Sequence, residues 1–140
     1  MNPSVGFTAG AWDLLHAGHV MFLQECMGRC DTLVVGLHTN PSIDRSWKNS
    51  PVQTTFERFV QLKGFLKSPY IIPYDTERDL MNILSSQGIT KRFLGSDYEG
   101  QDFTGKDLCE GLGIELVYIP RMHDYSTSEL RQRIERVVVL

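Results

Sequence analysis

Residues 5–19 read VGFTAGAWDLLHAGH, and this stretch decides the fold. Its first part, residues 5–9, is short, small and apolar and leads into a glycine, which is typical of a buried β-strand. Residues 13–30 then predict a loop that continues into a helix, because apolar residues recur there at helical spacing. The inner stripe expected for this helix consists of Val20, Leu23, Met27 and Cys30.

Strand and helix patterns alternate along the rest of the chain. Residues 32–38 (TLVVGLH) form a continuous apolar run, as expected for a strand buried on both faces. Thr54 and Ser126 each begin a helix with a glutamate at capping-box distance. This alternation predicts an α/β fold with a Rossmann-like parallel five-stranded sheet and helices on both faces. The remaining expected elements are a loop over 38–53, a helix from Thr54 to about 67, a strand over 69–74, a helix over 77–87, a strand over 91–95, a loop over 96–105, a helix over 106–112, a strand over 114–119 and a loop over 121–125.

The composition narrows the class of protein. A chain of 140 residues that is 41% apolar predicts one folded domain over residues 1–140. Its net charge of −3 lacks the basic surplus of a nucleic-acid-binding protein. No run approaches the roughly 20 apolar residues of a membrane helix, so no membrane contact is expected. Three cysteines and a start without leader-like features predict a cytoplasmic protein with no disulfide scaffold.

In a parallel sheet of this kind, ligands bind beyond the carboxyl ends of the strands. The small residues around Ala9 and Gly10 allow a ligand to approach the backbone after the first strand. Gly18 and His19 lie where the helix begins, and a helix N-terminus with free N–H groups binds phosphate. His16 and His19 are three residues apart, so both side chains face one ligand and can donate to phosphate oxygens. These residues predict a phosphate site after the first strand.

Two other interpretations of these residues remain at this point. His19, Cys26 and Cys30 lie on the same expected helix and have the ligand types of a zinc site. The cysteines also coincide with the apolar stripe, which favours ordinary core packing. Alternatively, the histidines are solvated or core residues without a role in binding.

Two segments resemble the signatures of the cytidylyltransferase family of nucleotidyltransferases. Residues 10–19 (GAWDLLHAGH) resemble its aromatic-Asp pair followed by His-x-Gly-His, and residues 121–128 (RMHDYSTS) resemble its Arg-x-x-Gly-Ile-Ser-Thr-Thr segment. The similarity runs over nearly the whole chain, with glycerol-3-phosphate cytidylyltransferases as the most similar branch. It implies a nucleotidyltransferase that transfers CMP from CTP to a phosphorylated alcohol such as glycerol 3-phosphate, with release of pyrophosphate.

The resemblance also implies roles for individual residues. The catalytic group comprises His16, His19, Lys48 and Arg121, which would contact and neutralise phosphates. The nucleotide-binding group comprises Ala9, Gly10, Ala11, Trp12, Asp13, Gly18, Gly95, Asp97, Ser126 and Thr127. The acceptor-binding group comprises Arg58 and Lys67. No metal ligand from the protein is expected, because Mg²⁺ would bridge the triphosphate oxygens and keep most of its waters.

The chain departs from the family pattern at several positions. Trp12 stands where the family usually has Phe, and Ala11 replaces a Thr. Asn40 replaces an acidic residue, and Leu66 stands where a second acceptor-binding arginine is common, with Lys67 beside it. Residues 124–125 replace Gly-Ile in the late signature. These changes affect the expected acceptor more than the expected chemistry.

Several alternatives to a CTP-dependent enzyme stay open. One is an adenylyltransferase that uses ATP on a sugar phosphate, since enzymes that make nucleotide-activated heptose carry a similar Leu-His-Ala-Gly-His run. Another is an adenylyltransferase that uses ATP on a flavin phosphate. A non-catalytic nucleotide- or metal-binding module is a second class. Family members are usually dimers, so the resemblance also implies a homodimer.

Overall fold

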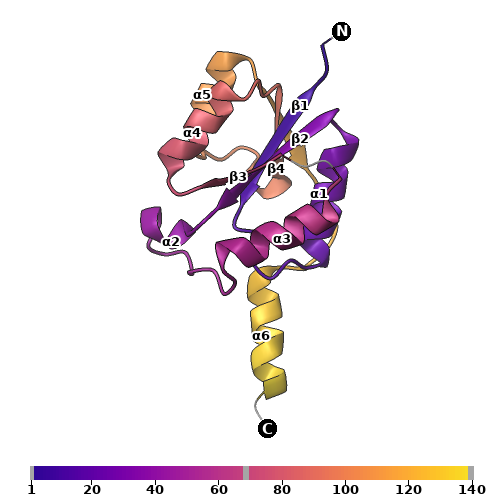
Figure 1. Ribbon diagram of the computed structural model, residues 1–140, viewed down its shortest axis with the longest axis vertical. Helices are drawn as coiled ribbons and strands as arrows, with labels where there is room; N and C mark the ends of the chain where they lie inside the picture. The colour runs from indigo at the N-terminus through magenta and orange to yellow at the C-terminus, as the bar shows by residue number, and fades with distance from the viewer. Residues whose placement is uncertain (1, 68–69, 139–140) are drawn as a thin grey trace.

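Five parallel strands form the centre of the molecule in this computed structural model, which describes residues 2–67 and 70–138. The strand order is β3-β2-β1-β4-β5. The chain therefore adds β2 and β3 on one side of β1 and then crosses to the other side, where it adds β4 and β5. This order reverses between β1 and β4, and all carboxyl ends lie at the end of the molecule from which α6 projects (Figure 1). The strands are β1 (Val5–Gly10), β2 (Thr32–His38), β3 (Tyr70–Tyr74), β4 (Lys91–Gly95) and β5 (Glu115–Ile119).

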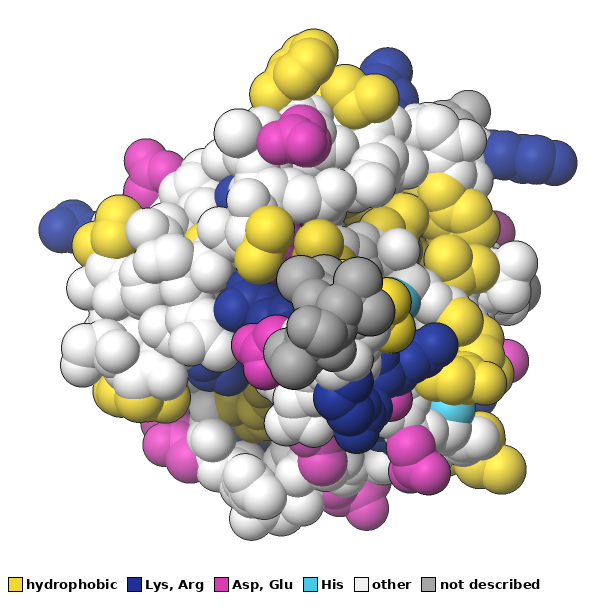
Figure 2. Space-filling view, turned by 90° about the horizontal axis from the view of Figure 1, so that it is seen from below, with side chains coloured by type: hydrophobic (Ala, Val, Ile, Leu, Met, Phe, Trp, Pro, Cys, Tyr) yellow, Lys and Arg dark blue, Asp and Glu magenta, His cyan; other side chains and the backbone are white. Residues whose placement is uncertain are grey.

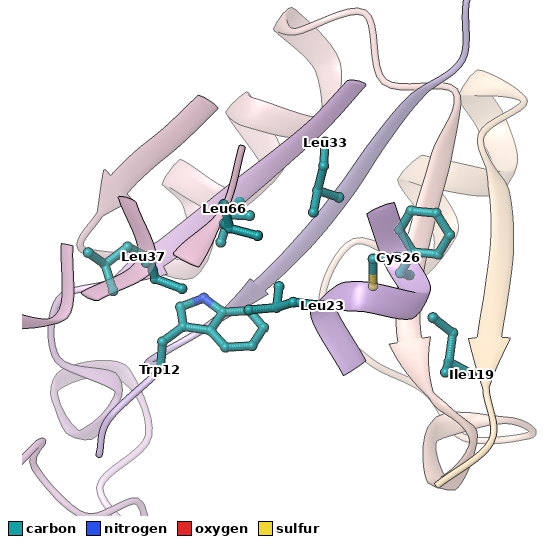
Figure 3. Packing of buried hydrophobic residues seen from close by; sticks show 10 residues of the cluster. Trp12, Leu23, Cys26, Leu33, Leu37, Leu66 and Ile119 are labelled. Atoms are coloured by element: carbon teal, nitrogen blue, oxygen red, sulfur yellow. The ribbon is translucent and has the colours of Figure 1, made fainter. Parts of the chain in front are cut away.

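Helices cover both faces of the sheet. Leu33, Val35 and Leu37 of β2 pack in one core cluster with residues of α1 and α3, whereas Val34 packs in a second cluster with residues of α4 and α5. This split follows from the two-residue period of a strand. Figure 3 shows the first cluster, in which Leu37 and Leu23 lie on either side of the Trp12 ring. The helices are α1 (Ala17–Gly28), α2 (Pro41–Asp44), α3 (Thr55–Phe65), α4 (Glu77–Ser86), α5 (Lys106–Leu112) and α6 (Thr127–Val138), with a 3₁₀ turn, η1 (Ser96–Tyr98).

The fold predicted from the sequence is confirmed, and most expected elements end within two residues of the observed ones. The expected start of the third strand at residue 69 lies outside the described residues. The region expected as a loop over 38–53 contains the short helix α2, which Asn40 caps by accepting a hydrogen bond from the Ser42 N–H at 3.1 Å, with Pro41 as its first residue. Four residues are too few to produce an apolar period, so the sequence pattern did not reveal this helix. Within the described ranges, no helix is long and apolar enough to span a bilayer.

Candidate active site

A cleft of about 630 Å³ opens at the carboxyl ends of β1 and β4, where the strand order reverses. Its floor includes Gly10 and Gly95, the last residues of these two strands. The start of α1 forms one wall, and the segment between β5 and α6 forms another. Figure 2 looks onto this end of the molecule, where Lys and Arg side chains gather around α6 and histidines reach the surface. The cleft therefore lies where ligands bind in open parallel sheets.

His16 and His19 form a stacked pair at this wall, with ring centroids 3.8 Å apart. His16 is the N-cap of α1, and its Nδ1 accepts hydrogen bonds from the N–H groups of Gly18 at 3.0 Å and His19 at 3.4 Å. The His19 Nδ1 in turn accepts from the His16 N–H at 3.4 Å. The free helix N–H groups expected for phosphate are thus occupied by an imidazole. The positive end of the α1 dipole therefore acts on the cleft through the His16 ring, which it polarises.

These hydrogen bonds determine which ring nitrogen of each histidine carries the proton and faces the cleft. Because each Nδ1 accepts a backbone N–H, a neutral ring carries its proton on Nε2. Burial lowers the pKa of His16, as do electrostatic interactions with His123 and Arg121, and burial lowers the pKa of His19 to about 3. Both rings are therefore neutral near pH 7. Each presents an Nε2–H donor, which suits binding of phosphate oxygens.

Asp13 lies between two residues with unusual backbone angles, Trp12 (φ 53°) and Leu14 (φ 52°). Positive φ is rare outside glycine, so this turn depends on its contacts. The Asp13 carboxylate accepts hydrogen bonds from the N–H groups of Gln53 at 2.9 Å and Val52 at 2.8 Å. Burial raises the pKa of Asp13, but these bonds together with Arg131 outweigh burial and hold it below its usual value. Asp13 thus fastens the loop after β1 to the loop after β2 as an ionised group.

Trp12 packs beneath the histidines. Its side chain is buried, its Nε1–H donates to the Gly36 carbonyl at 3.0 Å, and its ring meets His19 edge-on at 5.4 Å. A Cβ at Gly10 would lie 3.2 Å from the Trp12 ring, so Gly10 leaves room for the indole. Where the family usually has Phe, this chain has a ring that also binds the neighbouring strand.

A smaller cavity of about 240 Å³ adjoins the cleft and shares Ala9, Gly10, Phe22 and Gly95 with it. Lys48 and Arg45 line this cavity, and both also line a shallow pocket beside Asp13. The Arg45 Nε lies 3.1 Å from Glu77 Oε1, in an orientation that makes an ion pair without a hydrogen bond. The predicted Lys48 is therefore placed beside the small cavity, across the shared floor from the histidines. Arg45 carried no signal in the sequence, because the residues of α2 before it form no recognisable pattern.

Arg58 is placed differently from the sequence expectation. Its side chain is 1% exposed, and it lines neither the cleft nor the adjoining cavity. The guanidinium donates to the carbonyls of Ala11 at 2.9 Å, His38 at 2.8 Å and Thr39 at 2.7 Å. Its Nε donates to the Gln53 carbonyl at 3.1 Å. With its donors used in this way, Arg58 holds the loops after β1 and β2 together and is not available to bind an acceptor phosphate.

Lys67 is also not brought to the site. It is exposed at the end of α3, three residues before β3 begins, and therefore lies toward the amino-end edge of the sheet. The carboxyl-end edge, with the cleft, is on the opposite side. The neighbouring Leu66 is 4% exposed and belongs to the core. Neither acceptor-binding residue expected from the sequence therefore reaches the cleft.

The remaining predicted residues divide between the two sides of the site. Arg121 and Ser126 line the cleft, and Arg121 Nη2 donates to the Tyr125 carbonyl. The Thr127 hydroxyl instead donates to the Asp13 carbonyl at 3.1 Å, on the side of the shallow pocket. Asp97 is exposed at the cleft, and a Cβ at Gly95 would lie 2.5 Å from its carboxylate. Gly95 therefore permits Asp97 to fold back over the end of β4.

Two further residues of the site were missed from the sequence. Arg131 of α6 binds Asp13, with Nη2 3.0 Å from Oδ2. His123 lines the cleft next to Gly18. His123 lies inside the second signature segment, residues 121–128, and this position was the only sequence feature that indicated a role for it. Thr127 and Arg131 are four residues apart and therefore lie on one face of α6. This spacing alone does not identify Asp13 as the partner of Arg131.

The zinc interpretation finds no support in the geometry. Among residues 2–67 and 70–138, no group of three or more His, Cys, Asp or Glu side chains is arranged to hold a metal. Cys26 is fully buried in the core, and burial raises the pKa of both Cys26 and Cys30. The two thiols are therefore protonated core groups, as the apolar stripe suggested.

The fold and this site together define a nucleotidyltransferase-type α/β domain. The chain belongs to the cytidylyltransferase-like family, whose model matches residues 7–133. Several curated relatives carry the name bifunctional protein HldE. The one from Granulibacter bethesdensis is 30% identical over 96% of this chain and 28% of its own length, and the one from Paramagnetospirillum magneticum is 33% identical over 91% and 26%. The chain therefore spans about a quarter of the length of the curated relatives it matches.

Solved structures show the same fold. A lipopolysaccharide core biosynthesis protein from Thermoplasma volcanium superposes with a TM-score of 0.62 and 26% identity, covering 89% of this chain and all of that one. Pantothenate synthetase from Thermus thermophilus superposes with a TM-score of 0.59 over 93% of this chain and 64% of that one. At 14% identity, the latter shows a likeness of fold alone.

Proposed function

We propose that residues 1–140 act as one nucleotidyltransferase domain, in which an acceptor phosphate attacks the α-phosphorus of a nucleoside triphosphate and pyrophosphate leaves. The observation that carries this proposal is the pair of adjoining cavities that share Ala9, Gly10 and Gly95. The larger one takes the triphosphate, and the smaller one takes the acceptor. Their shared floor has small residues, so the reacting phosphates can meet close to the backbone.

The side chains around this floor supply positive or hydrogen-donating groups from both sides. His16 and His19 face the cleft with neutral Nε2–H donors, and Arg121 lines the same cleft. Lys48 and Arg45 line the acceptor side. Nucleotidyl transfer requires orientation and charge stabilisation with little covalent participation of the protein. Removing one such donor is expected to slow turnover about 100-fold or more.

Mg²⁺ fits this site as an ion carried by the nucleotide. The Asp13 carboxylate is fully occupied by two backbone N–H groups and Arg131, so it is not a free metal ligand. Asp97 is the exposed carboxylate at the end of β4. The donor set therefore suits an ion that binds mainly phosphate oxygens and water, and such an ion would supply neutralisation of the triphosphate charge.

Two substrate pairs have support. A sugar phosphate with ATP is favoured by the likeness of the histidine motif to that of sugar-phosphate adenylyltransferases, and by the solved relative whose title places it in lipopolysaccharide core biosynthesis. CTP with glycerol 3-phosphate is favoured by the two signature segments, residues 10–19 and 121–128. The polar rim of the small cavity, which includes Glu77, Tyr74 and Thr104, provides partners for acceptor hydroxyls in either pair. The homodimer implied by the resemblance and the cytoplasmic location expected from the sequence both remain predictions.

The test is release of pyrophosphate with Mg²⁺, offering ATP, CTP, GTP and UTP in turn with heptose 1-phosphate, glycerol 3-phosphate and flavin mononucleotide. Turnover with one pair identifies the base and the acceptor. His16→Gln should then reduce kcat about 100-fold, and Lys48→Ala should raise the KM for the acceptor. Lys63→Ala on the exposed side of α3 is the matched control and should change neither. Binding of nucleotide without turnover for any pair would contradict the enzymatic proposal in favour of a binding module.

A further inference from the structure

His123 lies directly over the start of α1, although it comes from the segment between β5 and α6. A Cβ built on Gly18 would be 2.8 Å from His123 Cε1 and 2.9 Å from His16 Cε1. The two imidazoles therefore bracket the same point above Gly18, and both line the larger cleft. The electrostatic interaction with His123 is also one of the causes that lower the pKa of His16, which agrees with this proximity.

The hydrogen bonding of His123 determines its tautomer. Its Nδ1 accepts the Tyr125 backbone N–H at 3.1 Å, and its ring stacks on the Tyr125 ring with centroids 5.3 Å apart. With Nδ1 acting as an acceptor, the proton of the neutral ring is on Nε2. Within the described residues, this Nε2 has no hydrogen-bond partner, although the ring is half-buried. His123 is thus prepared in the same way as His16 and His19, by a backbone N–H bound to Nδ1.

Building on the proposed function, we infer that His123 is a third triphosphate-binding histidine, which donates from Nε2 to the phosphates that leave as pyrophosphate. His16 and His19 are stacked on each other, so their donors lie close together. His123 reaches the same cleft from a different segment, the one between β5 and α6, beside Arg121. A third donor from a separate segment lets the site contact more than one phosphate group of a polyphosphate. Hydrogen bonds from a neutral donor to a charged acceptor are among the stronger ones.

A structural role for His123 is the competing explanation, since its Nδ1 bond shapes the turn to Tyr125. Two substitutions separate these roles. Asparagine can accept the N–H of the residue two positions on, so His123→Asn keeps the turn and removes the distal donor. Glutamine places its amide N–H near the position of Nε2, so His123→Gln keeps the distal donor and lacks the short acceptor. Asp124→Asn, on an exposed neighbour in the same segment, is the matched control.

The experiment measures two quantities for each variant: inhibition of turnover by pyrophosphate, and direct binding of a nucleoside triphosphate and of its monophosphate with Mg²⁺. We expect His123→Asn to weaken triphosphate binding and pyrophosphate inhibition about tenfold or more, with monophosphate binding unchanged. His123→Gln should retain most of both, and Asp124→Asn should match the parent protein. Thermal unfolding of each variant reports whether the turn is intact.

The opposite ranking, with His123→Gln weak and His123→Asn normal, would overturn the inference and assign His123 to shaping the turn. Equal triphosphate binding by all variants would also overturn it. Failure of the proposed function looks different: the parent protein would then release no pyrophosphate with any substrate pair. The triphosphate-binding comparison still tests His123 in that case, because it needs no turnover.

Discussion

Arg131 and Asp13 form an ion pair with Nη2 3.0 Å from Oδ2, although they are 118 residues apart in the chain. The pair joins α6 to the turn after β1, and the Thr127 hydroxyl adds a second bond from α6 to the Asp13 carbonyl. Asp13 also binds the backbone before α3. One carboxylate thus connects the β1 loop, the segment after Lys48 and the base of the helix that carries the late signature.

Replacing Asp13 with asparagine should therefore loosen three segments at once. The asparagine keeps one acceptor oxygen and presents an N–H₂ group to backbone donors, which leaves a buried donor without a partner. We expect a loss of about 1–3 kcal/mol in the free energy of unfolding, measured by urea denaturation. Glu110→Gln, on the exposed side of α5, is the control. If Asp13→Asn unfolds at the same urea concentration as the parent, the carboxylate does not support these segments.

Stability should decrease as the pH falls below about 6.5, the usual pKa of histidine. Burial lowers the pKa of His19 to about 3 and also lowers the pKa of His16 and His38. The unfolded chain therefore takes up protons at pH values where the folded protein does not, so stability rises with pH in this range and is complete above it. Asp13 adds a loss of the same sign only at lower pH, as its depressed pKa is approached.

Unfolding by urea at pH 7.5 and pH 5 measures this effect. His19→Gln should reduce the difference between the two pH values, since it removes one of the titrating groups, and the remaining slope should come from His16 and His38. An unchanged difference in His19→Gln would mean that His19 titrates normally in the folded protein.

Gly18→Ala should separate activity from stability. Alanine is favoured over glycine within a helix by about 0.5–1 kcal/mol, so the substitution on its own should not destabilise α1. Its Cβ would nevertheless lie under 3.0 Å from the rings of His16 and His123 and must displace them. We expect turnover to fall about tenfold or more, whereas the melting temperature should change little, because the gain in helix propensity offsets the weakened His16 cap. Gly28→Ala, where a Cβ meets nothing within 4 Å, is the matched control on the same helix.

Arg58→Leu should act on stability more than on acceptor binding. Removing the guanidinium leaves the carbonyls of Ala11, His38 and Thr39 without their donor. Each buried unsatisfied group costs about 1–3 kcal/mol, so a total loss above about 3 kcal/mol is expected. Gln61→Ala, exposed on α3, is the control. A stable Arg58→Leu variant with only a raised KM for the acceptor would instead support the acceptor-binding role expected from the sequence.

The sequence determined the parts of this protein that depend on neighbouring residues. The alternation of apolar runs and capped helices predicted the parallel sheet and both helical layers, because strand and helix periods are local properties. The histidine motif predicted the position of the site for the same reason: His16 caps its own helix and meets His19 one turn later. The strand that precedes the motif ends at the reversal of the sheet order, where a ligand site forms.

The tertiary structure decided the roles of the charged side chains that come from distant segments. Arg58 resembled a phosphate ligand in its residue type and position, yet its partners are carbonyls of loops that come together only when β1 and β2 pair. Arg131 and His123 carried little local signal, because Asp13 and Gly18 are more than 100 residues away from them. A guanidinium or an imidazole can bind many partners. Which one it binds depends on burial and on the groups that the fold brings within reach.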